Sequence, residues 1–450
     1  MLAPLALALA CNGGGGSDDD TTTTTAPGTS ADSTTGEATV AVTTTAATDS
    51  TSDVAPCPSG LPGCPCLDDG TCSPGLACLD EICVDAGTTT DDTEAPPPGC
   101  GNGTPDPDEL CYGATSFYGC PDEALFAALG DLDGDGHLDL LAAGATAGVV
   151  EVRLGDGTGE LGNPQSFSAG PRPVALRLDR FDDDDALDVA IAQEQGNAMG
   201  LLLGDGMGGL GSLTSYPTGA GPNQLFLVDF DEDGMVDVLT SNGGDDTITF
   251  LRRTGIGFQA PTPYPVGAGP HGLFVGEISN DPNLDVVVAN QGADSFGVLL
   301  GTGPTVLGPH VAVPTGAQPE SLAVVDWNGD GELDVMTSNL GSDDLRLRYG
   351  DGNGGFGAEI PFPVGADPRS LAALDVDGDG DLDAVVANTG ADTVTVLLGS
   401  GGGLFMPAQT FAVGSQPWGL AVGDLNEDGL ADLVVTNVGD DLLAVILSDA

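Results

Sequence analysis

The stretch that decides the fold is DVDGDGDLD at residues 375–383, which runs directly into the apolar segment AVVA at 384–387. Acidic residues occupy positions 1, 3, 5 and 9 of this nine-residue loop, and glycine occupies position 6. Alternate carboxylates on a tight turn bring several oxygen atoms together, as a hard cation such as Ca²⁺ requires. The stretch therefore predicts a calcium loop that leads into a buried strand.

The same loop recurs along the chain with a constant period. Position 1 falls at residues 131, 180, 229, 277, 326, 375 and 424, in steps of 48 or 49 residues. Each copy lies between two apolar runs, and a third run, a Gly-rich turn and a fourth extended stretch follow. Four short strands in a period of about 49 residues are typical of a propeller blade. We therefore predict an all-β fold, a seven-bladed β-propeller of four-stranded blades, over residues 122–450.

The ends of the repeat predict how the ring closes. There are seven acidic loops but six Gly-rich turns, so the last blade lacks an outer strand. The segment ATSFY at 114–118 precedes the first loop as outer strands precede the other loops. An N-terminal strand that completes the last blade would protect an otherwise open sheet edge.

These repeats resemble FG-GAP/VCBS-type units, the propeller family that includes the heads of integrin α-subunits. The closest pattern is the bacterial form, D-x-[DN]-x-D-G-x-x-D between the first and second strands, over about three quarters of the chain. The resemblance implies calcium in these loops. It specifies function poorly, because propellers carry many activities.

Five loops keep an acidic or amide residue at every ligand position, and we expect about five structural Ca²⁺ ions in them. The predicted ligands are Asp131, Asp133, Asp135, Asp139, Asp229, Asp231, Asp233, Asp237, Asp326, Asn328, Asp330, Asp334, Asp375, Asp377, Asp379, Asp383, Asp424, Asn426, Asp428 and Asp432. Position 7 is expected to contribute a backbone carbonyl, so His137 is expected to be a bystander.

Two loops depart from the pattern. Arg180 stands at position 1 of the second loop, and we expect its guanidinium to replace the ion. The fourth loop has Glu277 and Ser279 at positions 1 and 3, and we expect it to bind weakly or not at all.

Two alternatives to calcium loops of this type are acidic turns without metal and EF-hands. An EF-hand needs a Glu at position 12 and flanking helices, whereas Val386 stands there in the sixth copy. Without metal, the clustered carboxylates would repel one another. At about 1 mM Ca²⁺ and a Kd of about 0.1 mM, each site would add about 1.4 kcal/mol to the free energy of unfolding.

The N-terminal region predicts export. Residues 1–11, MLAPLALALAC, form a short apolar stretch that ends in small residues before a cysteine, as in a secretory signal. It resembles the end of a bacterial lipoprotein signal, which implies cleavage before Cys11 and acylation of its thiol. We expect a surface or outer-membrane lipoprotein of a Gram-negative bacterium, with ordinary secretion as the alternative.

Small modules and linkers are expected between this signal and the propeller. Residues 12–56, rich in Thr, Ser, Gly and Asp, are predicted to be a disordered linker. Six cysteines in residues 57–84 predict a disulfide-rich module, with zinc as a weaker alternative because no histidine lies nearby. A second linker, 85–99, and a Cys-containing connector with the closing strand, 100–121, follow. With Cys11 acylated, one of the nine other cysteines would be unpaired or would form a bridge to another molecule.

Charge and loop composition limit the partners. With 69 acidic and 9 basic residues, the formal net charge is -60, which disfavours nucleic acid and leaves the lipid anchor as the only membrane contact. His271, Glu320, Arg369 and Trp418 each follow a proline in a loop on the face opposite the calcium loops. They are candidates for a ligand face there, although the favoured interpretation is that they cap the inner strands.

The sequence therefore favours a surface-displayed or secreted, monomeric binding or adhesion module for an extracellular protein or glycan. A polysaccharide-active enzyme and a structural coat protein remain as alternatives. The chain has three histidines and no G-x-S-x-G or H-E-x-x-H motif, so we predict no catalytic residues and no organic cofactor.

Overall fold

The computed structural model describes residues 76–79, 82–85, 112–113, 115–182, 184–255 and 257–448. In the unit formed by residues 13–98, the described part is a hairpin in which β1 (Leu76–Leu79) pairs antiparallel with β2 (Ile82–Asp85). The predicted signal with Cys11, the first linker, residues 86–99 of the second linker and the rest of the cysteine module lie outside the described residues. None of the helices in the described ranges combines the length and hydropathy needed to cross a membrane.

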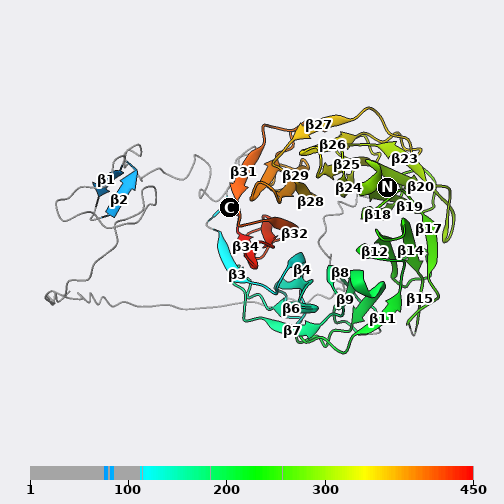
Figure 1. Ribbon diagram of the computed structural model, residues 1–450, viewed down its shortest axis with the longest axis horizontal. Helices are drawn as coiled ribbons and strands as arrows, with labels where there is room; N and C mark the ends of the chain where they lie inside the picture. Colours follow the sequence, from blue (N-terminus) through cyan, green and yellow to red (C-terminus); the bar gives the residue numbers. More distant parts are fainter. Residues whose placement is uncertain are drawn as a thin grey trace, which may run out of the picture. The chain divides into compact units, whose positions relative to one another are not determined.

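Seven antiparallel sheets of four strands stand around a common axis and form a β-propeller (Figure 1), as predicted. The first three blades, from inner to outer strand, are β4 (Ala124–Gly130), β5 (Asp139–Gly144), β6 (Val149–Arg153), β7 (Gln165–Ser168); β8 (Pro173–Asp179), β9 (Asp188–Gln193), β10 (Ala198–Leu202), β11 (Thr214–Pro217); and β12 (Pro222–Val228), β13 (Asp237–Asn242), β14 (Thr247–Leu251), β17 (Thr262–Pro265).

The remaining blades repeat this order. They are β18 (Pro270–Gly276), β19 (Asp285–Asn290), β20 (Ser295–Leu299), β23 (Val311–Pro314); β24 (Pro319–Val325), β25 (Asp334–Asn339), β26 (Asp344–Arg348), β27 (Ile360–Pro363); β28 (Pro368–Leu374), β29 (Asp383–Asn388), β30 (Thr393–Leu397), β31 (Gln409–Ala412); and β32 (Pro417–Gly423), β33 (Asp432–Asn437), β34 (Leu442–Ile446), β3 (Ser116–Gly119).

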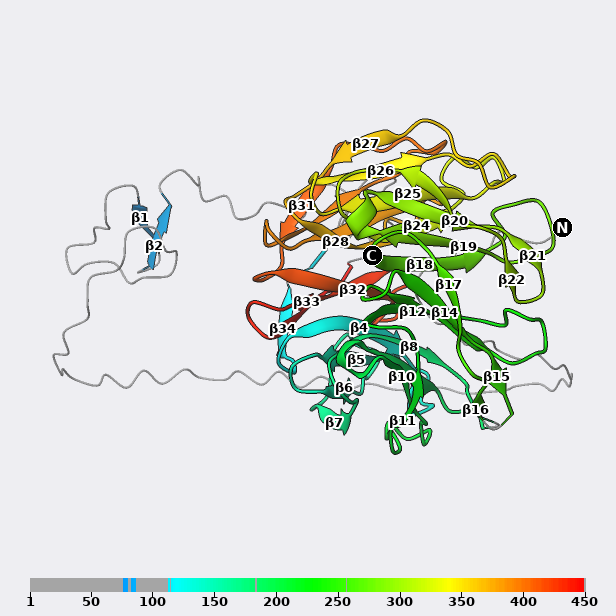
Figure 2. The same cartoon turned by 45° about the vertical axis from the view of Figure 1, so that its right-hand side comes forward.

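Short extra elements decorate the connections between strands. The pairs β15 (Arg253–Thr254) with β16 (Gly257–Phe258) and β21 (Gly301–Gly303) with β22 (Val306–Leu307) lie in the turns between third and fourth strands. Figure 2 shows both pairs at the same end of the ring. Two 3₁₀ turns, η1 (Glu194–Gly196) and η2 (Gln291–Ala293), lie between second and third strands.

The ring closes through the N-terminal strand, as predicted. β3 pairs antiparallel with β34, from Ser116 opposite Val445 to Gly119 opposite Leu442, and Figure 1 shows the two strands side by side. The Tyr118 hydroxyl donates to Glu160 of the first blade at 3.2 Å. The closing strand therefore contacts both the last blade and the first blade, which meet at the seam.

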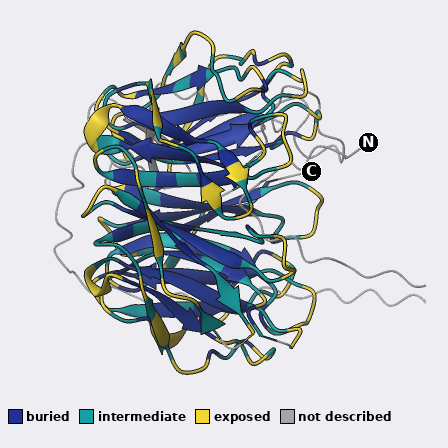
Figure 3. Ribbon diagram, turned by 90° about the vertical axis from the view of Figure 1, so that its right-hand side faces the viewer, coloured by how far each residue is buried: buried dark blue, intermediate teal, exposed yellow. Residues whose placement is uncertain are grey.

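The hydrophobic core consists of apolar layers between neighbouring blades (Figure 3). Every residue of each second strand is buried; in β29, Val385 packs toward one neighbouring blade and Val386 toward the other. Because both faces of these strands are covered, their sequences are continuous apolar runs rather than alternating ones. This burial also places the first residue of each second strand, an aspartate, in the interior.

The seam gives a first prediction, in which two aromatic residues of β3 are compared. Tyr118 is half-buried and contacts the first blade, with the Arg153 guanidinium 5.7 Å from its ring centre, whereas Phe117 is 53% exposed. Tyr118→Ala should lower the free energy of unfolding by about 2–3 kcal/mol, and Phe117→Ala should change it by no more than about 0.5 kcal/mol. Urea denaturation measures both, and equal effects would contradict closure through Tyr118.

Candidate functional site

The aspartate at position 9 of each acidic loop is a buried clamp. In all seven loops one carboxylate oxygen accepts the N–H of loop position 2, at 2.6–3.1 Å. The other oxygen accepts the N–H of the residue sixteen positions later, in the turn after the third strand, at 2.6–2.9 Å. Asp188 and Asp285, in the two departing loops, keep both bonds. Position 9 therefore fixes the loop whether or not the other ligands are present.

Positions 1, 5 and 6 shape the rest of the turn. In the five complete loops the position-1 aspartate accepts the N–H of the position-6 glycine at 2.8–3.1 Å. In all seven loops the position-5 aspartate accepts the N–H of position 7 at 2.7–3.0 Å. Gly380 has a φ of 93° with open space where a Cβ would be, so glycine is needed for its backbone conformation.

Carboxylates converge in these turns as a calcium ion would require. Ligand oxygens of positions 1, 3 and 9 lie within 4.8 Å of one another in the first, third and sixth loops. The fifth and seventh loops have the amides Asn328 and Asn426 at position 3. Oxygen donors of this kind suit Ca²⁺, which accepts carboxylate and amide ligands together. The side chain of His137 contacts Glu427 of the seventh loop at 2.5 Å.

The third loop already contains a cation of its own. The Arg252 guanidinium pairs with Asp231 through Nε and with Asp233 through Nη2, the latter at 3.1 Å. The corresponding residue is leucine in five other repeats, at 154, 203, 300, 398 and 447. A guanidinium on positions 3 and 5 competes with a metal ion for the same oxygens. We therefore expect four calcium loops rather than five.

The second and fourth loops use other bonds. Arg180 Nε donates to the backbone carbonyl of Asp185 in its own loop at 3.0 Å. In the fourth loop the Ser279 hydroxyl donates to Asp285 at 2.8 Å, and the Asn280 amide donates to Glu332 of the fifth loop at 3.2 Å. The three loops with substitute bonds belong to consecutive blades, the second to the fourth.

Calcium stoichiometry tests the role of Arg252. We expect isothermal titration calorimetry to give about four Ca²⁺ per chain for the wild type and about five for Arg252→Leu, because the variant frees the carboxylates of the third loop. Arg346→Leu is the matched control. This substitution removes the same charge, but Arg346 pairs with Asp344 and Glu359 rather than with ligands of an acidic loop. Equal stoichiometry in the wild type and Arg252→Leu would contradict competition by the guanidinium.

Burial shifts the titration of the position-9 carboxyls. Burial raises the pKa of Asp139, Asp237 and Asp334 to about 6 and that of Asp383 to about 7. The two backbone N–H donors to each carboxylate lower its pKa and offset part of this effect. Neighbouring loop carboxylates, such as Asp377 beside Asp383, raise the pKa further. The metal-free fold therefore favours the protonated forms of these acids.

This shift predicts opposite pH trends with and without metal. Because the folded-state pKa lies above the ordinary aspartate value, the contribution to stability is complete below about pH 4 and is lost as the pH rises through 6–7. In EDTA the Tm should be higher at pH 5 than at pH 7.5. Calcium needs ionised ligands, so the rise in Tm that calcium causes should be larger at pH 7.5. Scanning calorimetry at constant ionic strength measures this, and a larger rise at pH 5 would contradict it.

The opposite end of the ring has a second repeated feature, a β-bulge at the start of every inner strand. In all seven blades the pairing register with the second strand shifts after the first residue of the inner strand. The second residues of the inner strands, hereafter the mouth residues, are Leu125, Val174, Asn223, His271, Glu320, Arg369 and Trp418. All seven line one cavity of about 140 Å³. Because the inner strands run from this mouth to the acidic loops, the two sites lie at opposite ends.

The backbone before the mouth residues is held in an unusual conformation. The residue two positions earlier has a φ of 53–63° in every blade, and five of these residues are not glycine: Glu123, Arg172, Gln318, Asp367 and Gln416. In six blades a side chain from the preceding blade accepts its N–H at 2.8–3.1 Å; in blade seven, for example, Asp392 accepts from Gln416. Such strain is concentrated at functional sites.

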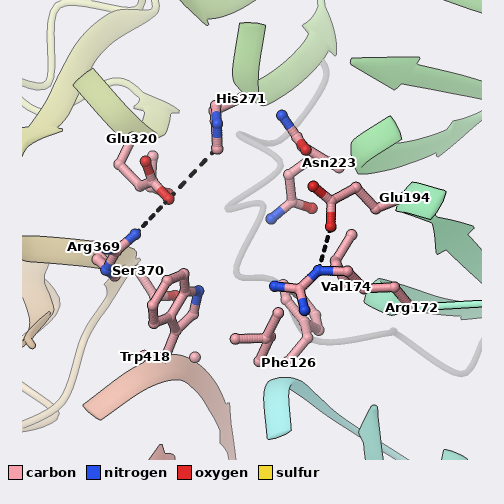
Figure 4. A pocket seen from close by; sticks show the side chains of 14 residues that line it. Phe126, Arg172, Val174, Glu194, Asn223, His271, Glu320, Arg369, Ser370 and Trp418 are labelled. Atoms are coloured by element: carbon pink, nitrogen blue, oxygen red, sulfur yellow. Dashed lines mark hydrogen bonds and ion pairs between the residues drawn. The ribbon is translucent and has the colours of Figure 1, made fainter. Parts of the chain in front are cut away.

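Glu320 is the centre of a polar network at the mouth (Figure 4). Its carboxylate accepts from Arg369 at 3.1 Å and from Gln291 at 2.5 Å, and lies 3.4 Å from His271 Nδ1. Arg369 stacks on Trp418, with its guanidinium carbon 3.5 Å from the ring centre. Burial acts to raise the pKa of Glu320, but the nearby His271 and Arg369 bring it below its ordinary value. Glu320 is therefore held as a carboxylate.

A second ion-pair cluster lies across the cavity. Arg172 donates to both carboxylate oxygens of Glu123, at 2.8 and 2.9 Å. It also pairs with Glu194 (Figure 4). Leu125, Val174 and Phe126 supply apolar lining beside it. The mouth thus combines fixed charges with an apolar wall in one small cavity.

The structure brings together all four residues predicted on the ligand face. Sequence reasoning missed Leu125, Val174 and Asn223, which occupy the same repeat position and could have been found by counting from the acidic loops. It also missed Arg172, Glu194 and Arg252, whose roles depend on side-chain contacts between blades or within the third loop. Cys120 forms no disulfide within the described residues, and burial raises the pKa of its thiol to about 12.

Comparison with known proteins identifies the repeat and the fold. Residues 277–337, 326–386 and 375–435 each match the FG-GAP-like repeat family. No curated protein matches the chain in sequence.

Several solved structures share the propeller at low sequence identity. BBS1N in complex with ARL6DN matches with a TM-score of 0.55 and 14% identity over 75% of this chain and 96% of that chain. Virginiamycin B lyase from Staphylococcus aureus matches with a TM-score of 0.52 and 11% identity, over 74% of this chain and 99% of that chain. Kuenenia stuttgartiensis hydrazine synthase matches with a TM-score of 0.52 and 12% identity, over 74% of this chain and 96% of that chain. At these identities the likeness shows the fold alone.

Proposed function

Because this chain is an FG-GAP-repeat β-propeller, we propose that it is a binding module whose ligand enters the mouth at the axis. Calcium in the acidic loops stabilises the opposite end of the ring, and the N-terminal region displays the propeller outside the cell. The ligand belongs to an extracellular protein or glycan, so the module serves adhesion or capture.

The variation among the mouth residues carries this proposal. The position-9 aspartate is identical in all seven blades, whereas seven different residue types occupy the mouth position. A residue that only caps an inner strand has no reason to differ in every blade. Different residues around one axis make an asymmetric surface, which is what recognition of a ligand requires.

The mouth groups are arranged for binding rather than for turnover. The lowered pKa of Glu320 keeps it ionised, which suits a fixed hydrogen-bond acceptor. Bulges, strained turns and ion pairs fix the lining before a ligand arrives, and such preorganisation reduces the entropy cost of binding.

A binding array compares the wild type with two variants. Immobilised extracellular glycans and matrix proteins are probed in calcium with the wild type, with Glu320→Gln/Arg369→Gln and with Met207→Ala. The double variant keeps the net charge and polar side chains at both positions but removes the mouth ion pair and the guanidinium donors. The control, Met207, is 70% exposed in a turn at the acidic-loop end.

We expect a signal from the wild type that falls about tenfold or more in the double variant, because charged hydrogen bonds contribute about 1.5–3 kcal/mol each. The control should bind like the wild type. A ligand that binds the double variant as strongly as the wild type would overturn the mouth as the binding site. Circular dichroism confirms that each variant is folded.

A further inference from the structure

The mouth residues separate into two unlike sectors. Trp418, Leu125 and Val174 come from three consecutive blades, the seventh, first and second, and form an apolar sector together with Phe126. Asn223, His271, Glu320 and Arg369 come from the third to sixth blades and form a polar sector. Figure 4 shows Trp418 and Phe126 on one side of the cavity and Asn223 and His271 on the other. A complementary ligand therefore has one apolar face and one hydrogen-bonding face.

The charges around the cavity favour a neutral ligand. Arg369 pairs with Glu320, and Arg172 pairs with Glu123 and Glu194. A charged ligand would have to break one of these pairs and leave a charge buried without its partner, which is costly. The formal net charge of -60 also repels anions that approach from solution.

The polar sector offers both donors and acceptors at close range. Glu320 accepts hydrogen bonds, while Arg369 and Asn223 carry donors. Arg369 Nε is buried and has no hydrogen-bond partner within the described part of the chain. Hydroxyl groups donate and accept at once, so neighbouring hydroxyls on a ring can bind a carboxylate and a guanidinium together.

The size of the cavity limits the occupant. Its volume of about 140 Å³ is below the roughly 300–1,000 Å³ of pockets for drug-sized ligands. One six-membered ring is of suitable size, and a longer chain would continue into solvent.

We infer that the mouth binds one neutral sugar ring, with its C–H face on Trp418 and its hydroxyls on Glu320, Arg369 and Asn223. This inference rests on the proposed binding function and names its ligand class. Arg369 covers one face of the indole and fixes its orientation, so the other face is in place before the sugar arrives. The aromatic ring of Trp418 contacts the apolar face of such a ligand, and the charged groups bind its hydrogen-bonding face.

The tryptophan content of the chain allows a direct test. The chain has two tryptophans, so Trp327→Phe leaves Trp418 as the only indole fluorophore. Trp327 lies in the fifth acidic loop and is 5% exposed. This full-length variant is titrated with methyl glycosides of neutral hexoses and N-acetylhexosamines. Glucuronic acid, leucine and a short neutral peptide are the comparison ligands.

We expect at least one neutral glycoside to change the Trp418 emission in a saturable way and glucuronic acid to bind about tenfold more weakly or worse. Calorimetry should show a Kd raised about tenfold or more in Glu320→Gln and in Trp418→Leu, and unchanged in Met207→Ala. Thermal melting checks that each variant is folded. Leucine replaces Trp418 because Leu125 occupies the same position in the first blade.

The outcomes separate this inference from the proposed function. If glucuronic acid, leucine or the peptide changes the Trp418 emission in a saturable way and no neutral glycoside does, the sugar is refuted as the ligand. Binding at the mouth is then still supported. A glycoside that binds by calorimetry with the same Kd in Glu320→Gln and Trp418→Leu overturns the mouth as well. No saturable change with any of the neutral glycosides also overturns the inference.

Discussion

The hydrogen bonds of the position-9 aspartates are the constraint on which the rest of the propeller depends. Each of these carboxylates, such as Asp383, ties the start of the acidic loop to the turn after the third strand. An aspartate buried in this way is stable only because backbone donors satisfy both oxygens. Three strands of a blade are thereby fixed by one side chain, and repetition of that side chain sets the period of the whole ring.

Variation is tolerated where the clamp does not depend on it. The second to fourth blades have lost ligands or acquired Arg252, yet their clamps remain, so the fold itself needs no ion in those blades. The four loops suited to calcium belong to the fifth, sixth, seventh and first blades. These blades are contiguous across the seam where β3 pairs with β34, so the expected metal sites flank the closing strand.

The sequence predicted the fold almost completely, because period, apolar runs and loop glycines are local patterns that repeat seven times. It also predicted four of the seven mouth residues, His271, Glu320, Arg369 and Trp418, from the proline that precedes each of them. It could not predict that Arg252 pairs with Asp231, because leucine at equivalent positions gives no hint of where a longer side chain will turn. The ion pairs of Arg172 were also beyond it, since they join residues 22 and 49 positions apart.

Closure by an N-terminal strand has a mechanical consequence. Tension along the chain that precedes the propeller reaches the ring at Tyr112, which forms a bridge with Ser448, and then at β3 (Ser116–Gly119). β3 has four paired positions on β34 and lies at the outer rim. Pulling outward on such an edge strand breaks its backbone hydrogen bonds one after another rather than together. Detachment of β3 would expose the edge of β34 while the other six blades keep their four strands. The first structural response to traction is therefore the opening of one blade, at the point farthest from the mouth along its sheet.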